Sequence, residues 1–527
     1  MLNLEIEVSN KLNSKHKTTI IPVLSIHQKI LFNYLKNYLE VDNQHNKKII
    51  DELQDKFKLN QDTQVSLIIE LNGIVYHIIL IGISITLEEQ KLLKLTKNNL
   101  EKNKNCGLLL DKLRNKGAEM FLDIDNNKLD SLNMGMISNL SDDINGMVNT
   151  ALLEGFLLAS YKFNKYKTNK KSKSKLKFAN LVFPKIMKPK LKNIEKDVAK
   201  LRIRMRSVFF ARDLVNEPGN KLYSTKFIEV VKNFVKLHNI PVKITVWDTN
   251  KLQKEGMNLL DSVGKGSLPE RGSKLLFIEY KTSQRNNPDY VLIGKGVTFD
   301  TGGITMKPGH KMHEMKNDMG GAAAVVAFIL GYAKFGGSQK IIGLIPLSEN
   351  NIGKGATSPG DVITSHSGKT VEIIDTDAEG RLLLADCLSY TSKKYPKSKV
   401  IDIATLTGSQ ENLACKQFSN VISRHPELSD NIVKSGNFIQ ELVVELPYME
   451  KFKKFLKSDV ADLGNIAAKC NSELMTSSVF LGQFIDPKVE WAHIDIAGTV
   501  GNLGNDVKYV PGMSSGVGVR LLFNLIE

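Results

Sequence analysis

Charged side chains gather at the end of an apolar, strand-like run in the segment GKGVTFDTGGITMKP, residues 294–308. The segment contains Lys295, Asp300 and Lys307 among glycines and a proline, directly after the run YVLI. Burying even one such charge without a partner is costly, so three charges close together need partners from elsewhere in the chain. The rest of the sequence must supply these partners.

Two later segments supply carboxylates. The first, MHEMKNDMGG at 312–321, places Asp318 just before a helix that opens with glycine. The second, IIDTDAEGRLLLAD at 373–386, carries Asp377 and Glu379 two residues apart. In extended backbone both of these side chains leave on the same face. We therefore expect the acids to converge on one site.

Four gathered carboxylates would repel one another unless cations lay between them. Such a set suits two divalent ions that share bridging oxygens, roughly 3.5–4 Å apart as in two-metal hydrolases. The motif HExxH is missing from the chain, so a zinc site of that class is not expected. Any single acid could instead cap a helix or pair with a lysine, but this explains all four poorly. A neutral lysine can ligate a metal, and a charged one can stabilise an oxyanion.

The elements that would position these residues alternate between strands and helices. We predict strands at 242–248, 274–280, 290–296, 340–347, 399–406 and 491–498, with helices between them that include 320–335 and 379–395. Near-continuous apolar strands separated by helices indicate a largely parallel sheet covered on both faces. Ligands bind beyond the carboxyl ends of such strands, where the charged segments fall.

The chain of 527 residues is too long for one ordinary core, so the predicted fold class is α/β with two domains. Residues 65–83 predict a hairpin that turns at Asn72-Gly73, and a helical pattern covers 137–163. The predicted organisation is an N-terminal mixed α/β domain (1–163), a basic linker and connecting segment (164–200), and a catalytic domain with a largely parallel central sheet flanked by helices (201–527).

Composition is that of a globular protein, with 42% hydrophobic and 24% charged residues. The net charge of +16 and the lysine-rich segment 162–178 leave nucleic acid open as a partner, although a solvated connector is the commoner case. The four cysteines are scattered and favour free thiols in a reducing compartment. The N-terminus lacks a signal-peptide pattern and the longest apolar run, 77–87, is too short to cross a bilayer, so we expect a cytoplasmic protein without a membrane partner.

The motifs GKGVTFDTGGITMKP, MKNDMGGAAAVV, DTDAEGRLLLAD and WAHIDIAG, with their spacing, resemble the leucine aminopeptidase family, the two-metal peptidases of the M17 type. The resemblance covers about 200–527 clearly and is weaker before it. It implies hydrolysis of N-terminal residues, Leu or other apolar ones by preference, from peptides, with two divalent ions (Zn²⁺ or Mn²⁺, with Mg²⁺ as a third candidate) and bicarbonate. It also implies a homohexamer.

The resemblance also assigns roles to individual residues. Asp300 and Glu379 fall on the ligands that bridge the two metals, Lys307 on the lysine that polarises the scissile carbonyl, and Arg381 on the arginine that holds a bicarbonate base. The full set of implied metal ligands is Lys295, Asp300, Asp318, Asp377 and Glu379. The positions implied for the pocket of the first side chain are Met315, Thr405 and Gly408.

The chain departs from the family pattern at several positions, namely Asp375 for asparagine, Ser358 for arginine, Asn351 for methionine, and 465–480, which lacks the expected glycines. These departures concern side-chain preference more than activity. Two other functions stay open. Some family members are DNA-binding architectural or regulatory proteins, and carboxylate clusters also serve two-metal phosphoesterases. A lysine ligand is unusual in the latter, so we place the peptidase first.

Overall fold

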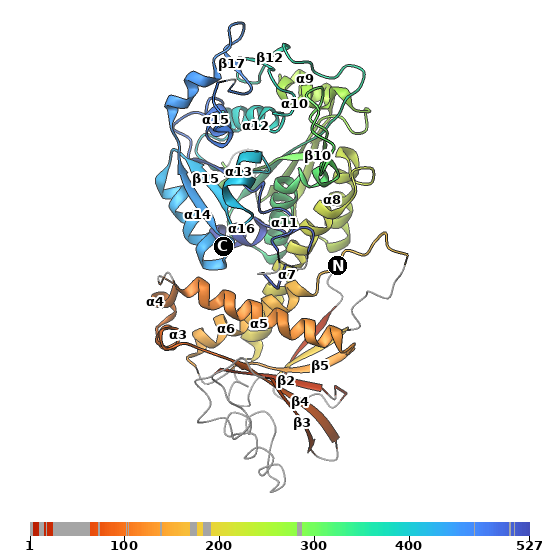
Figure 1. Cartoon of the computed structure of the whole chain (residues 1–527), viewed down its shortest axis with the longest axis vertical. Coiled ribbons are helices and arrows are strands. Elements are labelled where there is room, and N and C mark those ends of the chain that lie inside the picture. Colours follow the sequence, from red (N-terminus) through yellow and green to blue (C-terminus); the bar gives the residue numbers. More distant parts are fainter. Residues whose placement is uncertain are drawn as a thin grey trace. The chain divides into compact units, whose positions relative to one another are not determined.

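The structure is a computed structural model. It describes residues 4–9, 15–16, 18–24, 64–71, 74–101, 103, 105–137, 140–168, 176–182, 191–281, 287–467, 469–504, 507–510 and 512–527. The chain forms two compact units (Figure 1). The first comprises Met1–Met205 with Val507–Pro511, and the second comprises Arg206–Asp506 with Gly512–Glu527.

The first unit contains a mixed sheet with the strand order β1-β6-β5-β2-β4-β3. Its described strands are β1 (Glu5–Ser9), β2 (Thr18–Leu24), β3 (Gln64–Leu71), β4 (Ile74–Ile83), β5 (Ser131–Gly135) and β6 (Phe178–Val182). Its described helices are α3 (Leu87–Leu92), α4 (Lys97–Glu101), α5 (Cys106–Asn126) and α6 (Asp142–Ala159). Neighbouring strands run parallel except β3 and β4, which pair antiparallel.

The pairing of β3 with β4 confirms the predicted hairpin, although its turn residues Asn72 and Gly73 lie outside the described residues. The helix predicted over 137–163 is shorter, because it begins only at Asp142. Strand β6 lies inside the stretch 164–200 that the sequence suggests as a connecting segment, and it pairs with β1 and β5. The predicted domain boundaries stay a prediction.

The second unit is built on a sheet with the strand order β16-β15-β18-β14-β9-β11-β8-β7, in which β10 also pairs with β11. Its strands are β7 (Lys243–Trp247), β8 (Lys274–Tyr280), β9 (Tyr290–Gly294), β10 (Gly296–Asp300), β11 (Ile341–Asn350), β14 (Lys399–Ala404), β15 (Ser419–Ser423), β16 (Val443–Pro447) and β18 (Trp491–Asp495). The central strands β18, β14, β9 and β11 are parallel, and β8 and β15 join them antiparallel. This arrangement agrees with a largely parallel central sheet.

The sequence predicts a single strand over 290–296, but the structure breaks it at Lys295 into β9 and β10. At the break the backbone N–H of Lys295 donates to the carbonyl of Ile403, and its carbonyl accepts from the N–H of Ala322. The apolar run YVLI ends at Ile293, and the Gly-Lys-Gly sequence that follows it is the local signal of the break. The break leaves Lys295 between the two strands, at the carboxyl end of β9.

Helices cover both faces of this sheet (Figure 1). Ile342 and Leu344 of β11 belong to a core cluster that includes residues of α10, α12 and α15. Gly343, which lies between them, faces Ile329 of α11, whose Cδ1 would be 2.5 Å from an added Cβ. Adjacent residues of one strand therefore contact helices on opposite faces, as expected for a buried parallel sheet.

The helical elements of the second unit begin with α7, which starts in the first unit. In chain order they are α7 (Leu191–Asn216), α8 (Ser224–His238), α9 (Thr249–Lys254), α10 (Asn258–Val263), η4 (Gly264–Gly266), η5 (Met312–Asn317), α11 (Gly320–Phe335), α12 (Gly380–Lys394), α13 (Gly408–Ala414), α14 (Pro426–Ile439), η6 (Glu450–Leu456), α15 (Glu473–Gly482) and α16 (Val519–Ile526). A small sheet contains β12 (Val362–Thr364), β13 (Thr370–Glu372) and β17 (Leu463–Gly464).

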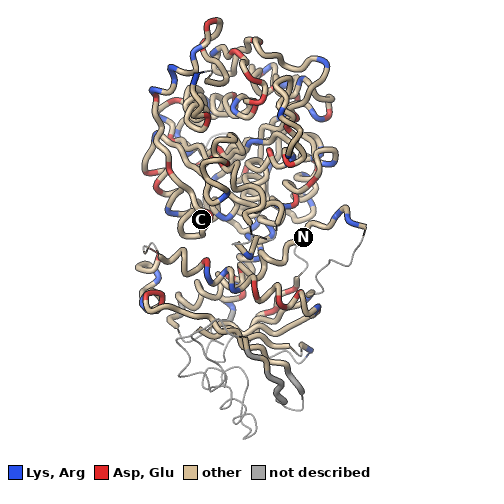
Figure 2. The backbone as a smooth tube through the Cα atoms, in the orientation of Figure 1, with Lys and Arg blue, Asp and Glu red and all other residues tan. Residues whose placement is uncertain are grey.

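One segment, Met312–Phe335, is long and apolar enough to cross a membrane, with a mean hydropathy of 1.3. However, 89% of its apolar window is buried inside the protein, which is typical of a core helix. Figure 2 shows Lys and Arg positions interspersed with Asp and Glu along the described parts of both units. The middle of the lysine-rich segment 162–178 lies outside the described residues, and nothing in the described part favours a nucleic-acid interface.

Candidate active site

Four strand and helix ends meet in the second unit. Asp300 is the last residue of β10, and Lys295 follows β9. Asp318 lies two residues before the start of α11, and Glu379 lies directly before α12. Because β14, β9 and β11 are neighbours in the sheet, their carboxyl ends share one edge. The residues that the sequence places after separate strands therefore converge.

Lys295 is buried among acceptors. Its Nζ lies 2.7 Å from Oδ1 of Asp318 and 2.9 Å from Oε1 of Glu379. It also donates to the carbonyl oxygen of Thr405 at 2.8 Å. Burial alone lowers the pKa of Lys295, but the charges of Asp318 and Glu379 outweigh it and hold the pKa above that of a free lysine. In this arrangement Lys295 carries a proton and neutralises the two carboxylates.

Lys307 holds the other carboxylates and reaches solvent. Its Nζ lies 2.8 Å from Oδ2 of Asp300 and 2.6 Å from Oδ1 of Asp377, and its side chain is 22% exposed. Burial lowers the pKa of Lys307, and the charges of Asp300 and Glu379 raise it further than burial lowers it. Lys307 is therefore a charged group that a bound molecule can reach.

The carboxylates outnumber the two ammonium groups. Asp300, Asp377 and Glu379 each present an oxygen within 4.8 Å of the others. Burial, followed by the charges of Asp300 and Glu379, raises the pKa of Asp377 to about 7. Burial likewise raises the pKa of Asp318, whose buried Oδ2 has no hydrogen-bond partner among the described residues. Crowded oxygen donors with an unsatisfied buried atom fit divalent cations.

Two polar side chains that the sequence did not single out hold this cluster in place. Asn350, at the end of β11, donates to Oδ1 of Asp300 at 2.8 Å and to the carbonyl oxygen of Thr376 at 3.0 Å. Thr376 donates to the carbonyl oxygen of Gly302 at 2.6 Å. The position of Asn350 at a strand end, beside the charged segments, is the signal that could have identified it.

Gly380 makes room for Lys295. A Cβ added at Gly380 would lie 2.5 Å from Cε and 2.7 Å from Nζ of Lys295, closer than such contacts occur. The first turn of α12 can therefore approach the lysine only because residue 380 lacks a side chain. This explains the glycine between Glu379 and Arg381.

Arg381 is 1% exposed, and its guanidinium contacts the segment 465–480. Its Nη1 donates to the carbonyl oxygen of Asn465 at 2.9 Å, and its Nη2 donates to Oε1 of Glu473 at 3.0 Å. Burial lowers the pKa of Arg381 from its usual value. The sequence did not predict these partners, which lie 84 and 92 residues further along the chain.

The three residues predicted to line the pocket for the substrate's first side chain differ in their contacts with the carboxylate cluster. Thr405 is buried and donates from Oγ1 to Oδ1 of Asp318 at 2.7 Å, so it contacts the cluster directly. Met315 lies in η5, where its carbonyl accepts from the N–H of Asp318. Gly408 begins α13, and a side chain added there would meet nothing within 4 Å. Asp375, the departure next to the cluster, uses Oδ1 to accept from the N–H of Asp377 at 2.8 Å, a bond that an asparagine carbonyl could also make.

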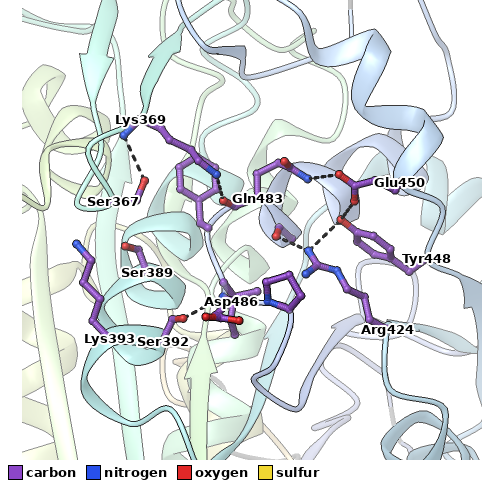
Figure 3. A pocket seen from close by; sticks show the side chains of 14 residues that line it. Ser367, Lys369, Ser389, Ser392, Lys393, Arg424, Tyr448, Glu450, Gln483 and Asp486 are labelled. Atoms are coloured by element: carbon purple, nitrogen blue, oxygen red, sulfur yellow. Dashed lines mark hydrogen bonds between the residues drawn. The ribbon is translucent and has the colours of Figure 1, made fainter.

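A separate pocket of about 640 Å³ lies at the end of α15 (Figure 3). As far as the structure describes the chain, its lining contains none of the predicted site residues. Its charged groups already have partners: Lys369 donates to the carbonyl of Gln483, and Arg424 donates to the hydroxyl of Tyr448, which donates to Glu450. The volume of this pocket exceeds that of the cavity beside the carboxylate cluster. Among the described residues, however, the lining of the pocket holds no excess of buried charge.

Comparisons with known proteins agree with this architecture. The sequence profile described as "Cytosol aminopeptidase family, catalytic domain" matches residues 209–523. The "Cytosol aminopeptidase" of Rickettsia prowazekii is 32% identical over 545 residues, 100% of this chain and 99% of that protein. The "Probable cytosol aminopeptidase" of Syntrophotalea carbinolica is 37% identical over 376 residues, 71% of this chain and 74% of that protein.

Among solved structures, the bottromycin maturation enzyme BotP in complex with Mn superposes with a TM-score of 0.76. It is 24% identical, over 97% of this chain and 98% of that one, so this likeness concerns the fold alone. The sequence profile covers more than half of the chain, and the Rickettsia relative aligns over its whole length. The chain therefore belongs to the cytosol aminopeptidase family, as its motifs predicted.

Proposed function

We propose that this aminopeptidase removes the N-terminal residue of peptides by a mechanism that uses two divalent cations. The enzyme would hold these cations with Lys295, Asp300, Asp318, Asp377 and Glu379. The observation that carries the proposal is the excess of carboxylates over ammonium groups at the carboxyl ends of neighbouring strands. When bound, such cations acidify water and polarise the scissile carbonyl. Oxygen-rich sites accept Zn²⁺, Mn²⁺ or Mg²⁺, so the native pair stays open.

The two lysines have different roles in this proposal. Lys295 is buried, and as a ligand it must release its proton and act as the neutral amine. Lys307 is partly exposed and stays charged, so it can donate a hydrogen bond to the carbonyl oxygen as negative charge develops there. A preorganised donor of this kind stabilises the transition state more than the substrate. Lys307 is thus the electrophilic group of the chain itself.

The proposed substrates are peptides with a free α-amine and an apolar first residue, Leu by preference. Thr405, which contacts Asp318, and the open position at Gly408 support a side-chain pocket beside the cluster. An apolar pocket discriminates one methylene by only about 1–3 kcal/mol, so we expect broad specificity. A cytoplasmic homohexamer belongs to the same proposal and is supported by family membership.

The test is release of the amine from leucine amide by metal-stripped protein, with and without added Mn²⁺ or Zn²⁺. We expect metal-dependent turnover that is absent when the substrate is N-acetylated, because the free α-amine is required. Folded and assembled protein that fails to turn over leucine amide with any of the three metals would contradict the proposal. Turnover of the N-acetylated substrate would contradict its exopeptidase part.

A further inference from the structure

The ion pair between Arg381 and Glu473 is asymmetric. Arg381 is 1% exposed, whereas the carboxylate of Glu473, 3.0 Å away, belongs to a side chain that is 41% exposed. Nη2 of Arg381 binds Glu473, and its Nη1 donates to the carbonyl of Asn465. One end of the pair is therefore fixed inside the protein, and the other presents a carboxylate to solvent.

The surroundings of Glu473 link it to both sides of the candidate site. Asn465 accepts from the N–H groups of Ile374 and Asp375 at 2.8 and 3.2 Å, which braces the loop that carries Asp377. On the other side, the N–H of Leu474 donates to Oγ of Ser409 at 3.0 Å. Hydrogen bonds thus connect the first turn of α15 to the loop that carries Asp377, through Arg381 and Asn465. They also connect it to the start of α13, where the pocket for the substrate's first side chain is proposed.

We propose that Glu473 is the general base of the hydrolysis, held in place by Arg381. The proposal rests on the aminopeptidase mechanism proposed above. The family resemblance places a free bicarbonate on Arg381, but here the carboxylate of the chain itself occupies that guanidinium. Arginine binds carboxylates and bicarbonate through the same planar fork. The segment 465–480, in which glycines are expected, thus supplies the group that the family takes from solution.

The chemistry balances without any other reactant. As the oxygen of the attacking water bonds to the scissile carbonyl carbon, Glu473 takes a proton from that water. When the carbon–nitrogen bond breaks, its electron pair stays on nitrogen, and the nitrogen receives the proton from Glu473. The products are the free amino acid and the shortened peptide, and Glu473 returns to the carboxylate. A positioned base of this kind contributes about 10²–10⁴-fold to the rate.

Two substitutions separate a base from a group that only neutralises Arg381. Glu473→Gln keeps the size and an oxygen that can accept from Arg381, but it cannot take a proton. Glu473→Ala leaves the guanidinium open to small carboxylates. We expect kcat to fall by about 10²–10⁴-fold in both variants with KM little changed. Added formate or bicarbonate should restore turnover to the alanine variant and not to the glutamine variant.

A binding measurement on metal-free protein provides a second readout. Formate should raise the unfolding temperature of Glu473→Ala, because it binds the folded state at Arg381, and leave the wild type and Glu473→Gln unchanged. Glu427→Ala is the matched control, since Glu427 is an exposed acid in the first turn of α14. This variant should match the wild type in both assays. If the alanine variant does not fold, the glutamine variant decides by its kcat.

The outcomes distinguish this inference from the proposed function. Three results together support the role of Glu473. The wild type turns over substrate in bicarbonate-free buffer, both variants lose this turnover, and added formate or bicarbonate rescues only the alanine variant. A wild type that needs added bicarbonate, or a glutamine variant with wild-type kcat, overturns it and leaves the aminopeptidase standing. Failure of formate to stabilise folded Glu473→Ala also overturns it. A wild type inactive with every metal overturns both.

Discussion

The carboxylate cluster and the pocket of Figure 3 lie in the same unit and differ in how their charges are balanced. The pocket has a volume of about 640 Å³, and its cations donate to backbone carbonyls or to a neighbouring hydroxyl. The cluster borders a cavity of only about 20 Å³, lined in part by Asn350, Thr376 and Glu379. Its carboxylates face too few cations, and the pKa of Asp377 rises to about 7.

Under the proposed function, volume alone does not locate the chemistry of this protein. A large pocket is the usual first guess for a binding site, and here it would point away from the residues that the motifs identify. At the proposed site, like charges add to burial in raising the pKa of Asp377, and such crowding of like charges is a better marker of chemistry than volume.

The largest expected effect follows Asp300→Asn. Asp300 has both oxygens in use, one on Asn350 and Gly302 and the other on Lys307. Loss of a group that only orients a ligand typically reduces metal affinity or activity by about 10–100-fold, so loss of Asp300, a proposed ligand itself, should exceed this. Metal content and turnover of leucine amide measure the effect. Asp486→Asn, which changes an acid lining the pocket, should alter neither, and an equal loss in both variants would refute the comparison.

Lys307→Ala should reduce kcat by about 10²–10³-fold, as for loss of one oxyanion donor. The variant should also unfold at a lower temperature than the wild type when both are metal-free, because Asp300 and Asp377 lose their shared cation. Added metal should reverse part of this second effect. Lys369→Ala, in the pocket, is the control and should leave kcat unchanged. If Lys307→Ala kept the kcat of the wild type, Lys307 would not be the group that stabilises the oxyanion.

Arg424→Ala tests the pocket as a structural feature. Arg424 donates to the carbonyl of Gly482 and to Tyr448, and its guanidinium lies 4.5 Å from the Tyr448 ring centroid and 5.9 Å from that of Trp491. Removing it leaves a buried carbonyl without its donor, which typically costs about 1–3 kcal/mol of unfolding free energy. Urea unfolding should show this loss while kcat stays the same. A large loss of kcat with unchanged stability would give the pocket a part in catalysis.

The sequence predicted the carboxylate cluster because its members lie in long motifs at strand ends. All six predicted strands exist in the second unit, and Lys295, Asp300, Asp318, Asp377 and Glu379 come together at one edge of its sheet. Asn350, Asn465 and Glu473 were not predicted. Their roles depend on contacts with residues far away in sequence, such as the 92 residues between Arg381 and Glu473.

Strands β15 and β16 were also missed. Their sequences, SNVIS and VVELP, are short and partly polar, so they lack the continuous apolar pattern of the central strands. Pairing with β18 places β15 in the sheet, and β16 joins it through β15. Tertiary pairing thus determined these elements where local pattern was weak.

Asp386 provides a buried acid outside both the cluster and the pocket, and with it a smaller effect. It is 0% exposed, and its oxygens accept from the N–H groups of Leu260 and His366 at 3.0 and 2.8 Å. Burial raises the pKa of Asp386 to about 7, even though these two hydrogen bonds lower it. In the cluster, like charges add to burial, whereas at Asp386 burial acts without a like charge and is opposed by backbone hydrogen bonds.

Because the pKa of Asp386 is higher in the folded than in the unfolded state, the folded state keeps a proton that the unfolded state has lost between about pH 4 and pH 7. Asp386 therefore lowers the free energy of unfolding as pH rises through this window, by up to about 1.4 kcal/mol per pH unit. Asp386→Asn has no proton to lose and one acceptor fewer. It should be less stable than the wild type at pH values near 5, and the difference in unfolding free energy should shrink toward neutral pH. A difference that stays constant with pH would mean that the two backbone donors, and not burial, set the charge of Asp386.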